Sequence, residues 1–365
     1  MSSVDIEARA EALHRRAIII DGHSDILMPV TDGKMSLADR VEVPDGWQSP
    51  FLIPESGLGI PAQALFFGPM GQYDVPRLRE GGLTAQVCAI YIEDKELGWA
   101  VERGLHMAWH FHHAAETIPG FEAILTTADI QRIKAEGKVG GILSLEGFEA
   151  VGPNLWMLDL YYKLGLRIAS LTHVRRTFYA DGSYAAAQPG GLTASGSAAV
   201  RRMNELGIVV DLVHLHERGV WEVLEMTTAP VILSHSTSTM FPREGVDAIG
   251  VMGARVPRPR LTLPRDRAML EALRDNGGVL GVIWFYKIDL DDVVADIETA
   301  LEVMGPDHVG IGSDLYGLEL APQGLEHIGK MPALTRHLIE RGHPDAVIEK
   351  ILGGNFLRVF EQVWK

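Results

Sequence analysis

The chain of 365 residues contains a single cysteine, Cys88. One cysteine forms no disulfide within the chain and supplies no thiolate cluster for a structural zinc site. Any metal ion must therefore be held by His, Asp and Glu side chains. Cys88 itself lies within an apolar run, where we expect it to pack as a small buried hydrophobe.

The sequence also lacks any apolar run of about 20 residues, the length that a membrane-spanning helix needs. Basic residues are in deficit, with 33 against 48 acidic ones and a net charge of -15. A surface of this sign repels phosphate backbones, so we expect no nucleic-acid partner. The N-terminal stretch MSSVDIEARAEALHRRA is typical of a charged amphipathic helix rather than a signal peptide, and we expect a cytoplasmic location without a membrane partner.

Short apolar runs bounded by turn residues alternate with helical patterns along the chain. The runs are residues 17–21, 84–92, 140–146, 167–173, 207–214, 230–236, 278–285 and 308–314. Most are continuously apolar, which is typical of parallel strands covered on both faces. Several helical patterns end in glycine, the usual residue just past a helix. This order predicts an α/β fold, a (β/α)8 TIM barrel.

Two segments exceed the minimal barrel pattern, at about residues 28–80 and 237–263. Both follow the carboxyl end of a strand, which is the active-site face of such barrels. Long loops in that place usually cover or line a substrate site. No repeat or domain boundary is visible, so we expect residues 1–365 to form one domain. The tryptophans on predicted helices are expected in the core: Trp99, Trp109, Trp156 and Trp221.

Imidazole and carboxylate side chains stand at the carboxyl ends of six of these runs. They are His23, Asp25, Glu146, His173, His214, His235 and Asp314. His23 and Asp25 are two positions apart, so an extended backbone would point them to the same side. A barrel gathers its strand ends around one mouth, and buried ionisable groups there need mutual partners or a cation. The pattern therefore predicts a metal site.

The donor set indicates which ions this site would hold. Three imidazoles and two carboxylates, one of them Glu146 as a bridge, are enough for two ions about 3.5–4 Å apart, a common hydrolytic arrangement. Nitrogen and oxygen ligands of this kind favour Zn²⁺, with Mn²⁺ or Co²⁺ as alternatives. We therefore predict two Zn²⁺ per chain.

The motifs DGHSD, SLEG, SLTH, VVDLVH, PVILSHS and GIGSD, in this order, resemble those of the membrane (renal) dipeptidase family. This is peptidase family M19, a branch of the amidohydrolase superfamily. The resemblance extends from about residue 17 to the final GGNFLRVF and so covers nearly the whole chain. It implies a metallopeptidase with a zinc pair, and the relatives suggest a homodimer.

The resemblance also implies roles for the residues at the strand ends. His23 and Asp25 would bind the first ion and Glu146 would bridge to the second. His214 and His235 would bind that second ion. In addition, His173 would contact the scissile carbonyl and Asp314 would serve as the catalytic acid and base.

The substrate pocket departs from the family pattern. Phe148 and Glu149 follow Gly147 where the family usually has Gly and His, and Tyr316 stands where it usually has Asp. The arginine that would pair with the substrate carboxylate is best matched within the segment RPRL. The predicted substrate-binding residues are therefore Arg260, with Arg258 as its rival, Tyr316 and Tyr179.

These observations predict a zinc-dependent dipeptidase that hydrolyses the amide bond of a small dipeptide, including L-Xaa-D-Xaa forms, by a metal-bridged hydroxide. The alternative is a binuclear metal hydrolase of another small amide, a lactam or an ester. A barrel used only for binding is disfavoured, because the ligand and acid/base positions are intact. No G-x-S-x-G segment is present, so a serine nucleophile is not indicated.

Overall fold

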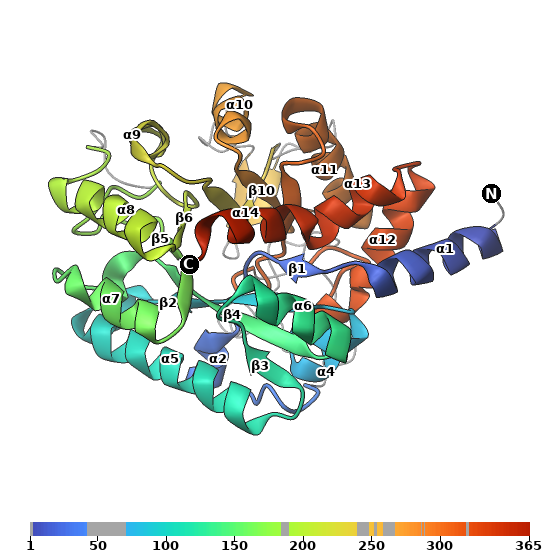
Figure 1. Cartoon of the computed structure of the whole chain (residues 1–365), viewed down its shortest axis with the longest axis horizontal. Coiled ribbons are helices and arrows are strands. Elements are labelled where there is room, and N and C mark those ends of the chain that lie inside the picture. The colour runs from blue at the N-terminus through green and yellow to red at the C-terminus, as the bar shows by residue number, and fades with distance from the viewer. Residues whose placement is uncertain are drawn as a thin grey trace.

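The computed structural model describes residues 3–41, 71–183, 190–238, 248–251, 254–257, 267–285, 287, 289–318 and 321–365. At its centre is a closed barrel of eight parallel strands, in the order β1-β2-β4-β5-β6-β7-β10-β11, with β11 beside β1 again (Figure 1). The barrel strands are β1 (Ile20–Asp21), β2 (Ala85–Tyr91), β4 (Val139–Glu146), β5 (Leu166–Ser170), β6 (Val209–Asp211), β7 (Ile232–Ser236), β10 (Val279–Ile283) and β11 (Val309–Gly312). Each lies within or overlaps one predicted run, and the (β/α)8 barrel is confirmed.

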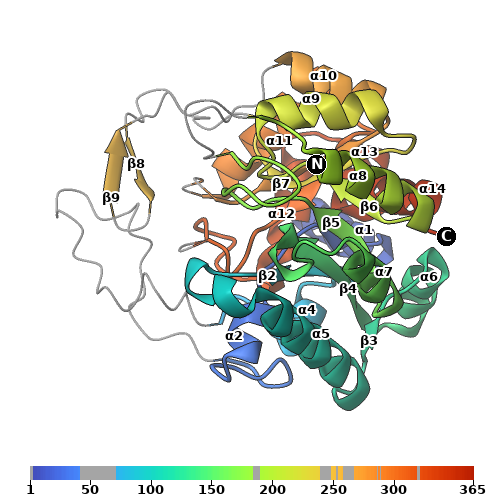
Figure 2. The ribbon, with the colours of Figure 1, turned by 90° about the vertical axis from the view of Figure 1, so that its left-hand side faces the viewer.

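Helices connect the strands and cover the outside of the barrel (Figures 1 and 2). The α-helices are α1 (Ser3–Arg16), α2 (Leu27–Thr31), α4 (Val75–Glu80), α5 (Ala100–Thr117), α6 (Thr127–Glu136), α7 (Trp156–Lys163), α8 (Ala194–Leu206), α9 (Glu217–Met226), α10 (Arg267–Asp275), α11 (Leu290–Met304), α12 (Met331–Glu340), α13 (Asp345–Glu349) and α14 (Asn355–Val363). Short turns of other helix types are η2 (Asp94–Trp99), η3 (Phe148–Ala150), η4 (Ile328–Lys330) and η5 (Lys350–Gly354). In the part of the chain that the structure describes, no helix combines the length and apolarity needed to cross a bilayer.

Three strands lie outside the predicted set. β3 (Phe121–Ala123) pairs in parallel with the start of β4 and leads into α6. β8 (Ala248–Val251) and β9 (Ala254–Pro257) form an antiparallel hairpin within the second insertion, set apart from the barrel in Figure 2. A charged residue interrupts β3 (FEA) and β9 (ARVP), and β8 (AIGV) lies in a Pro- and Gly-containing segment, so no continuous apolar run indicated them.

The barrel interior is filled by one layer of branched side chains and closed by the last helix. The interior cluster includes Ile20, Val87, Ile142, Ile168, Val209, Ile232 and Val279, together with Phe356 and Phe360 of α14. Figure 1 shows α14 lying across the amino-terminal end of the barrel. The opposite, carboxyl end is therefore the one left available for polar groups.

Close packing inside the barrel requires glycine at two strand positions. A β-carbon at Gly312 would lie 1.9 Å from the carbonyl oxygen of Ser234, and one at Gly281 would lie 2.0 Å from it. Only glycine therefore lets β10 and β11 approach β7 this closely, directly before His235.

The prediction that the helical tryptophans lie in the core is wrong for three of the four. Trp99, Trp109 and Trp156 are 44%, 55% and 64% exposed, whereas Trp221 packs partly buried against the core. A helical pattern identifies apolar residues, but it does not establish that each one faces the barrel.

The amino-terminal end of the barrel contains a buried histidine that joins three segments. The His14 ring bonds through Nδ1 to Thr335 Oγ1 at 2.7 Å and through Nε2 to the Gly81 carbonyl at 2.9 Å. A neutral ring satisfies both contacts when Nε2–H donates to Gly81 and Nδ1 accepts from the Thr335 hydroxyl. Burial lowers the pKa of His14, and the Gly81 hydrogen bond opposes this shift.

We expect His14 to make the protein less stable in acid. Below the ordinary imidazole pKa of about 6.5, the unfolded chain takes up a proton that the folded chain binds less readily. The free energy of unfolding therefore decreases as the pH is lowered. His14→Gln can keep both hydrogen bonds without titrating and should remove this part of the dependence. Urea titrations between about pH 8 and pH 5 would measure it, with exposed His113→Gln as control. An unchanged pH slope in His14→Gln would contradict the assignment.

Candidate metal centre

The seven polar residues predicted at the strand ends meet at the carboxyl rim of the barrel. Glu146 is the last residue of β4 and His235 lies within β7. The others follow their strands within four residues: His23 and Asp25 after β1, His173 after β5, His214 after β6 and Asp314 after β11. Parallel strands thus deliver side chains that are up to 291 positions apart in the sequence to one place.

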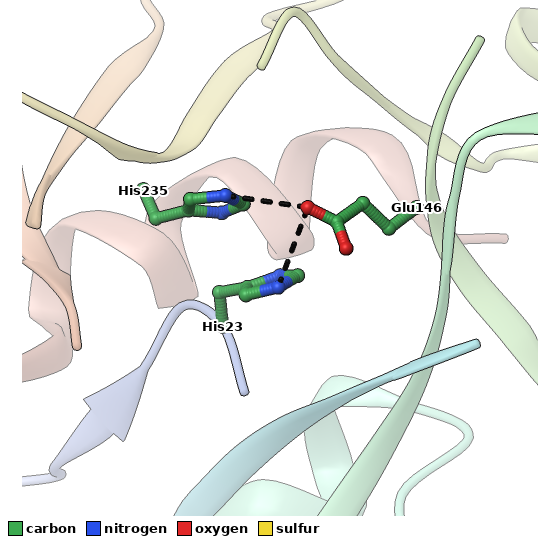
Figure 3. Close-up of side chains that lie close together, drawn as sticks. All are labelled: His23, Glu146 and His235. Atoms are coloured by element: carbon green, nitrogen blue, oxygen red, sulfur yellow. Dashed lines mark ion pairs between the residues drawn. The ribbon is translucent and has the colours of Figure 1, made fainter. Parts of the chain in front are cut away.

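Glu146 lies at the centre of this group. Its Oε1 atom is 2.9 Å from His214 Nε2, 3.4 Å from His235 Nε2 and 3.7 Å from His23 Nε2. Figure 3 shows the carboxylate directed toward the His23 and His235 rings. The Nε2 atoms of His214 and His235 face each other at 3.0 Å.

Two further carboxylates lie near the same ring nitrogen of His23. Its Nε2 atom is 3.7 Å from Asp25 Oδ2 and 3.9 Å from Asp314 Oδ1. Three overlapping groups of donor atoms result, each within 4.8 Å, and each could hold a metal ion: His23, Glu146 and His235; Glu146, His173 and His214; His23, Asp25 and Asp314.

The chemistry of the donor atoms fits a divalent cation. His23 Nε2 and Asp25 Oδ1 are buried and have no hydrogen-bond partner within the described part of the chain. Buried polar atoms without partners are costly, and several carboxylates sharing a dry site repel one another. A cation bound to these imidazole nitrogens and carboxylate oxygens would remove both costs.

Burial dominates the electrostatics of the carboxylates. It raises the pKa of Asp25, and the Glu146 charge adds to the shift. It likewise raises the pKa of Asp314 well above its usual range. For Glu146, burial acts in the same direction, but the positive His23 and the hydrogen bond from His214 outweigh it and hold the pKa well below the usual range.

The imidazoles divide into two kinds. Burial acts to lower the pKa of His23, but Glu146 and Asp25 outweigh it and raise the value to about 10. Burial lowers the pKa of His173 to about 3 and that of His235 well below the ordinary value. His173 and His235 are therefore neutral at physiological pH, the form in which an imidazole can bind a metal or donate one hydrogen bond.

Three residues at the rim adopt left-handed backbone conformations. The φ angles of His214, Asp314 and Tyr316 are 59°, 62° and 67°. Such angles in residues other than glycine cost of order 1–3 kcal/mol each and persist where the surrounding structure enforces them. Here they turn the chain sharply just after β6 and β11, which brings His214 and Asp314 to the centre.

Buried hydrogen bonds fix the strand ends beneath these residues. Asp211 Oδ1 accepts from the backbone N–H groups of Val213 and Ser234, each at 3.0 Å. Asp21 accepts from the backbone N–H of Ser313 at 2.7 Å and from its hydroxyl at 2.5 Å. The four ends of β1, β6, β7 and β11 are thereby joined in pairs.

The ring orientation of His235 is set by its neighbour in the chain. Its Nδ1 atom lies 2.9 Å from Ser234 Oγ. When Nδ1–H donates to that hydroxyl oxygen, Nε2 keeps its lone pair free toward Glu146 and His214. Ser234, Asp21 and Asp211 are not among the predicted site residues, although an aspartate within the runs AIIID and VVDLVH is a visible signal.

A second polar wall borders the centre at His173. The His173 ring packs at 4.3 Å from the His214 ring and edge-on at 4.7 Å from the Tyr91 ring. Arg175 Nη2 lies 3.4 Å from the Tyr91 hydroxyl, and its Nη1 donates to Glu149 Oε1 at 3.0 Å. The sequence argument gave no role to Tyr91 or Arg175.

The predicted substrate-binding residues have different surroundings. The buried Tyr179 hydroxyl donates to the Gly152 carbonyl at 2.9 Å, so its hydrogen is already bonded within the protein. Tyr316 lies two residues after Asp314 and is 8% exposed, with its hydroxyl 3.4 Å from the Tyr73 carbonyl. Arg258 and Arg260 lie outside the described residues.

Comparison with known proteins extends over most of the chain. The family profile of the membrane dipeptidases, peptidase family M19, matches residues 7–246 and 255–365. Dipeptidase aclJ of Aspergillus oryzae is 32% identical over 80% of this chain and 70% of its own length. Dipeptidase tcpJ of Claviceps purpurea is 30% identical over 64% of this chain. The matched region covers 53% of the length of that relative.

A solved structure shows the same fold. It is a metallo peptidase of Rhodobacter sphaeroides with a phosphinate mimic of the dipeptide L-Ala-D-Ala. It superimposes with a TM-score of 0.75 over 95% of this chain and 99% of its own, at 23% identity. Given the family match across the barrel and a rim of side chains that could hold a metal ion, the chain belongs to the membrane dipeptidase family, peptidase family M19, and is a metallo-dipeptidase.

Proposed function

We propose that the protein is a zinc-dependent dipeptidase with two Zn²⁺ per chain. The observation that carries this proposal is the position of Glu146, with one carboxylate oxygen within 3.7 Å of three histidine Nε2 atoms at the rim. Nitrogen-rich sites with carboxylate bridges favour Zn²⁺ over harder cations, although Mn²⁺ and Co²⁺ accept the same ligands.

We assign His23 and Asp25 to one ion and His214 and His235 to the other, with Glu146 shared. The nearness of His23 to Asp25 and of His214 to His235 supports this division. Bound zinc would supply an activated water as nucleophile at neutral pH and would polarise the scissile carbonyl.

The remaining rim residues would carry the proton and position the substrate. Asp314 is directed toward His23 and Asp25, where it can accept a proton from the attacking water and pass it to the leaving amine. The neutral His173 ring, held beside His214, can donate a hydrogen bond to the carbonyl oxygen as negative charge develops there. The substrate carboxylate is assigned to Arg260 or Arg258 on their sequence position alone.

Asp314→Asn tests the proton relay. The amide cannot accept the proton, so we expect turnover to fall by at least about a hundred-fold while zinc content stays at the wild-type level. Steady-state hydrolysis and elemental analysis of the same preparation provide the two readouts. The control is Asp307→Asn, an exposed aspartate paired with Lys350 before β11. Normal turnover in Asp314→Asn would refute the relay.

Removing a ligand should weaken metal binding independently of catalysis. For wild-type protein stripped of metal, zinc at about a hundred times its Kd should raise the free energy of unfolding by about 2.7 kcal/mol for each ion bound. His214→Ala and His235→Ala should show less bound zinc and a smaller stabilisation, because each loses one nitrogen donor. Exposed His113→Ala on α5 is the matched control. Full zinc content in both rim variants would contradict the ligand assignment.

A substrate screen distinguishes the dipeptidase from its alternative. We expect zinc-loaded enzyme to hydrolyse dipeptides and to accept a D-configured C-terminal residue, since a relative of the same fold is liganded with a mimic of L-Ala-D-Ala. The screen compares L-Xaa-L-Xaa and L-Xaa-D-Xaa dipeptides with lactams and esters. Phe148, Glu149 and Tyr316 depart from the family pattern and keep the alternative open. Turnover of lactams or esters without any dipeptide would overturn the proposal.

A further inference from the structure

A cavity of about 380 Å³ opens beside the metal centre on the carboxyl face of the barrel. It lies between the segments that follow β2, β4 and β5, and its wall includes Leu97, Phe148, Glu149, Arg175 and Phe178. The strand β4 that leads into this wall ends in Glu146, and β5 leads to His173. The cavity thus shares two of its three connections, those after β4 and β5, with the rim.

The outer part of the cavity is open to solvent and combines large apolar side chains with Arg176 and Thr177. Phe178 is 65% exposed and Leu97 is 45% exposed, while Phe148 behind them is 1% exposed. Apolar side chains lining a concave surface at an active-site rim are typical of a ligand pocket. An apolar group placed there would cover Phe178 and Leu97 and contact the rigid Phe148.

The inner part of the cavity is connected to the rim by a continuous set of contacts. Arg175 is 19% exposed in its side chain and binds Glu149, whose own side chain is 7% exposed. The same guanidinium contacts Tyr91, which packs against His173. Tyr91 and Arg175 therefore link His173 to the cavity wall, and a substrate side chain directed past Tyr91 would reach the cavity.

The order of the strands indicates which residue of a dipeptide faces the cavity, a step that rests on the proposed function. Asp314, assigned to protonate the leaving amine, follows β11, and the leaving amine belongs to the C-terminal residue. In the closed barrel β5 lies four strands from β11 in either direction, so His173 and the cavity are on the opposite side. The N-terminal residue of the substrate would then lie toward the cavity.

We propose that this cavity holds the side chain of the substrate's N-terminal residue and selects for a large apolar side chain. Its volume exceeds the needs of glycine or alanine at that position. The apolar wall of Phe148, Phe178 and Leu97 favours aromatic or branched aliphatic groups over charged ones.

Exposed wall residues can be changed with little effect on the core. Phe178→Ser and Leu97→Ser should lower kcat/KM for Phe-Gly by about ten-fold each while leaving Ala-Gly within about two-fold, because only the larger side chain reaches them. Trp156→Ser is the matched control, since Trp156 is an aromatic residue of similar exposure, 64%, on α7 and outside the cavity wall. The zinc content of all three variants should equal that of the wild type.

Three results would overturn the pocket assignment. Equal losses of kcat/KM on Phe-Gly and Ala-Gly would show that the cavity wall does not distinguish the side chain of the N-terminal residue. A selective loss on Gly-Phe instead of Phe-Gly would place the C-terminal residue there. A uniform loss with a change of molecular mass in solution would make the patch an interface between copies. Failure of the wild type on every dipeptide would overturn the proposed function as well, whereas normal hydrolysis without selectivity would overturn the pocket alone.

Discussion

The repulsion among buried carboxylates is the constraint on which the rest of this structure depends. Glu146, Asp25 and Asp314 are each no more than 8% exposed and lie around His23. Burial disfavours their charged forms, and each charge opposes the others. A cation held between them and the imidazoles would satisfy the group. The strained turns at the rim and the hydrogen bonds beneath it keep these mutually repelling donors together.

The two ends of the barrel differ in the contacts that their residues make. At the amino end, α14 closes the interior and His14 ties α1 to the Gly81 turn and α12, which are contacts that contribute stability. At the carboxyl end, the same strands present polar groups that pack poorly without a ligand. Parallel strands make this division automatic, since all of them end at the same face.

The sequence predicted the barrel well because each strand is a buried, continuously apolar run of detectable length. It also named the seven rim side chains, since a polar residue directly after such a run stands out. It could not show which side chains become neighbours: the pairing of Asp211 with Ser234 joins different strands, and the contact of Arg175 with Tyr91 crosses 84 positions. The sequence of β3, FEA, has a charged residue at its centre and so forms no continuous apolar run. The prediction that Trp156 lies in the core was wrong, because an apolar residue type does not determine whether a helical side chain faces the barrel or the solvent.

The turn after Glu146 connects the proposed metal centre to the cavity wall. Gly147 has a φ of +91°, and a β-carbon there would lie 2.2 Å from Glu149 Oε2. This turn lets the chain leave β4 at Glu146, a proposed metal ligand, and reach the cavity wall at Phe148 and Glu149 within three residues. Of the three positions that depart from the family pattern, Phe148 and Glu149 line the cavity, whereas Tyr316 follows β11. A substitution at either cavity position can therefore change the proposed pocket while Glu146 itself is retained.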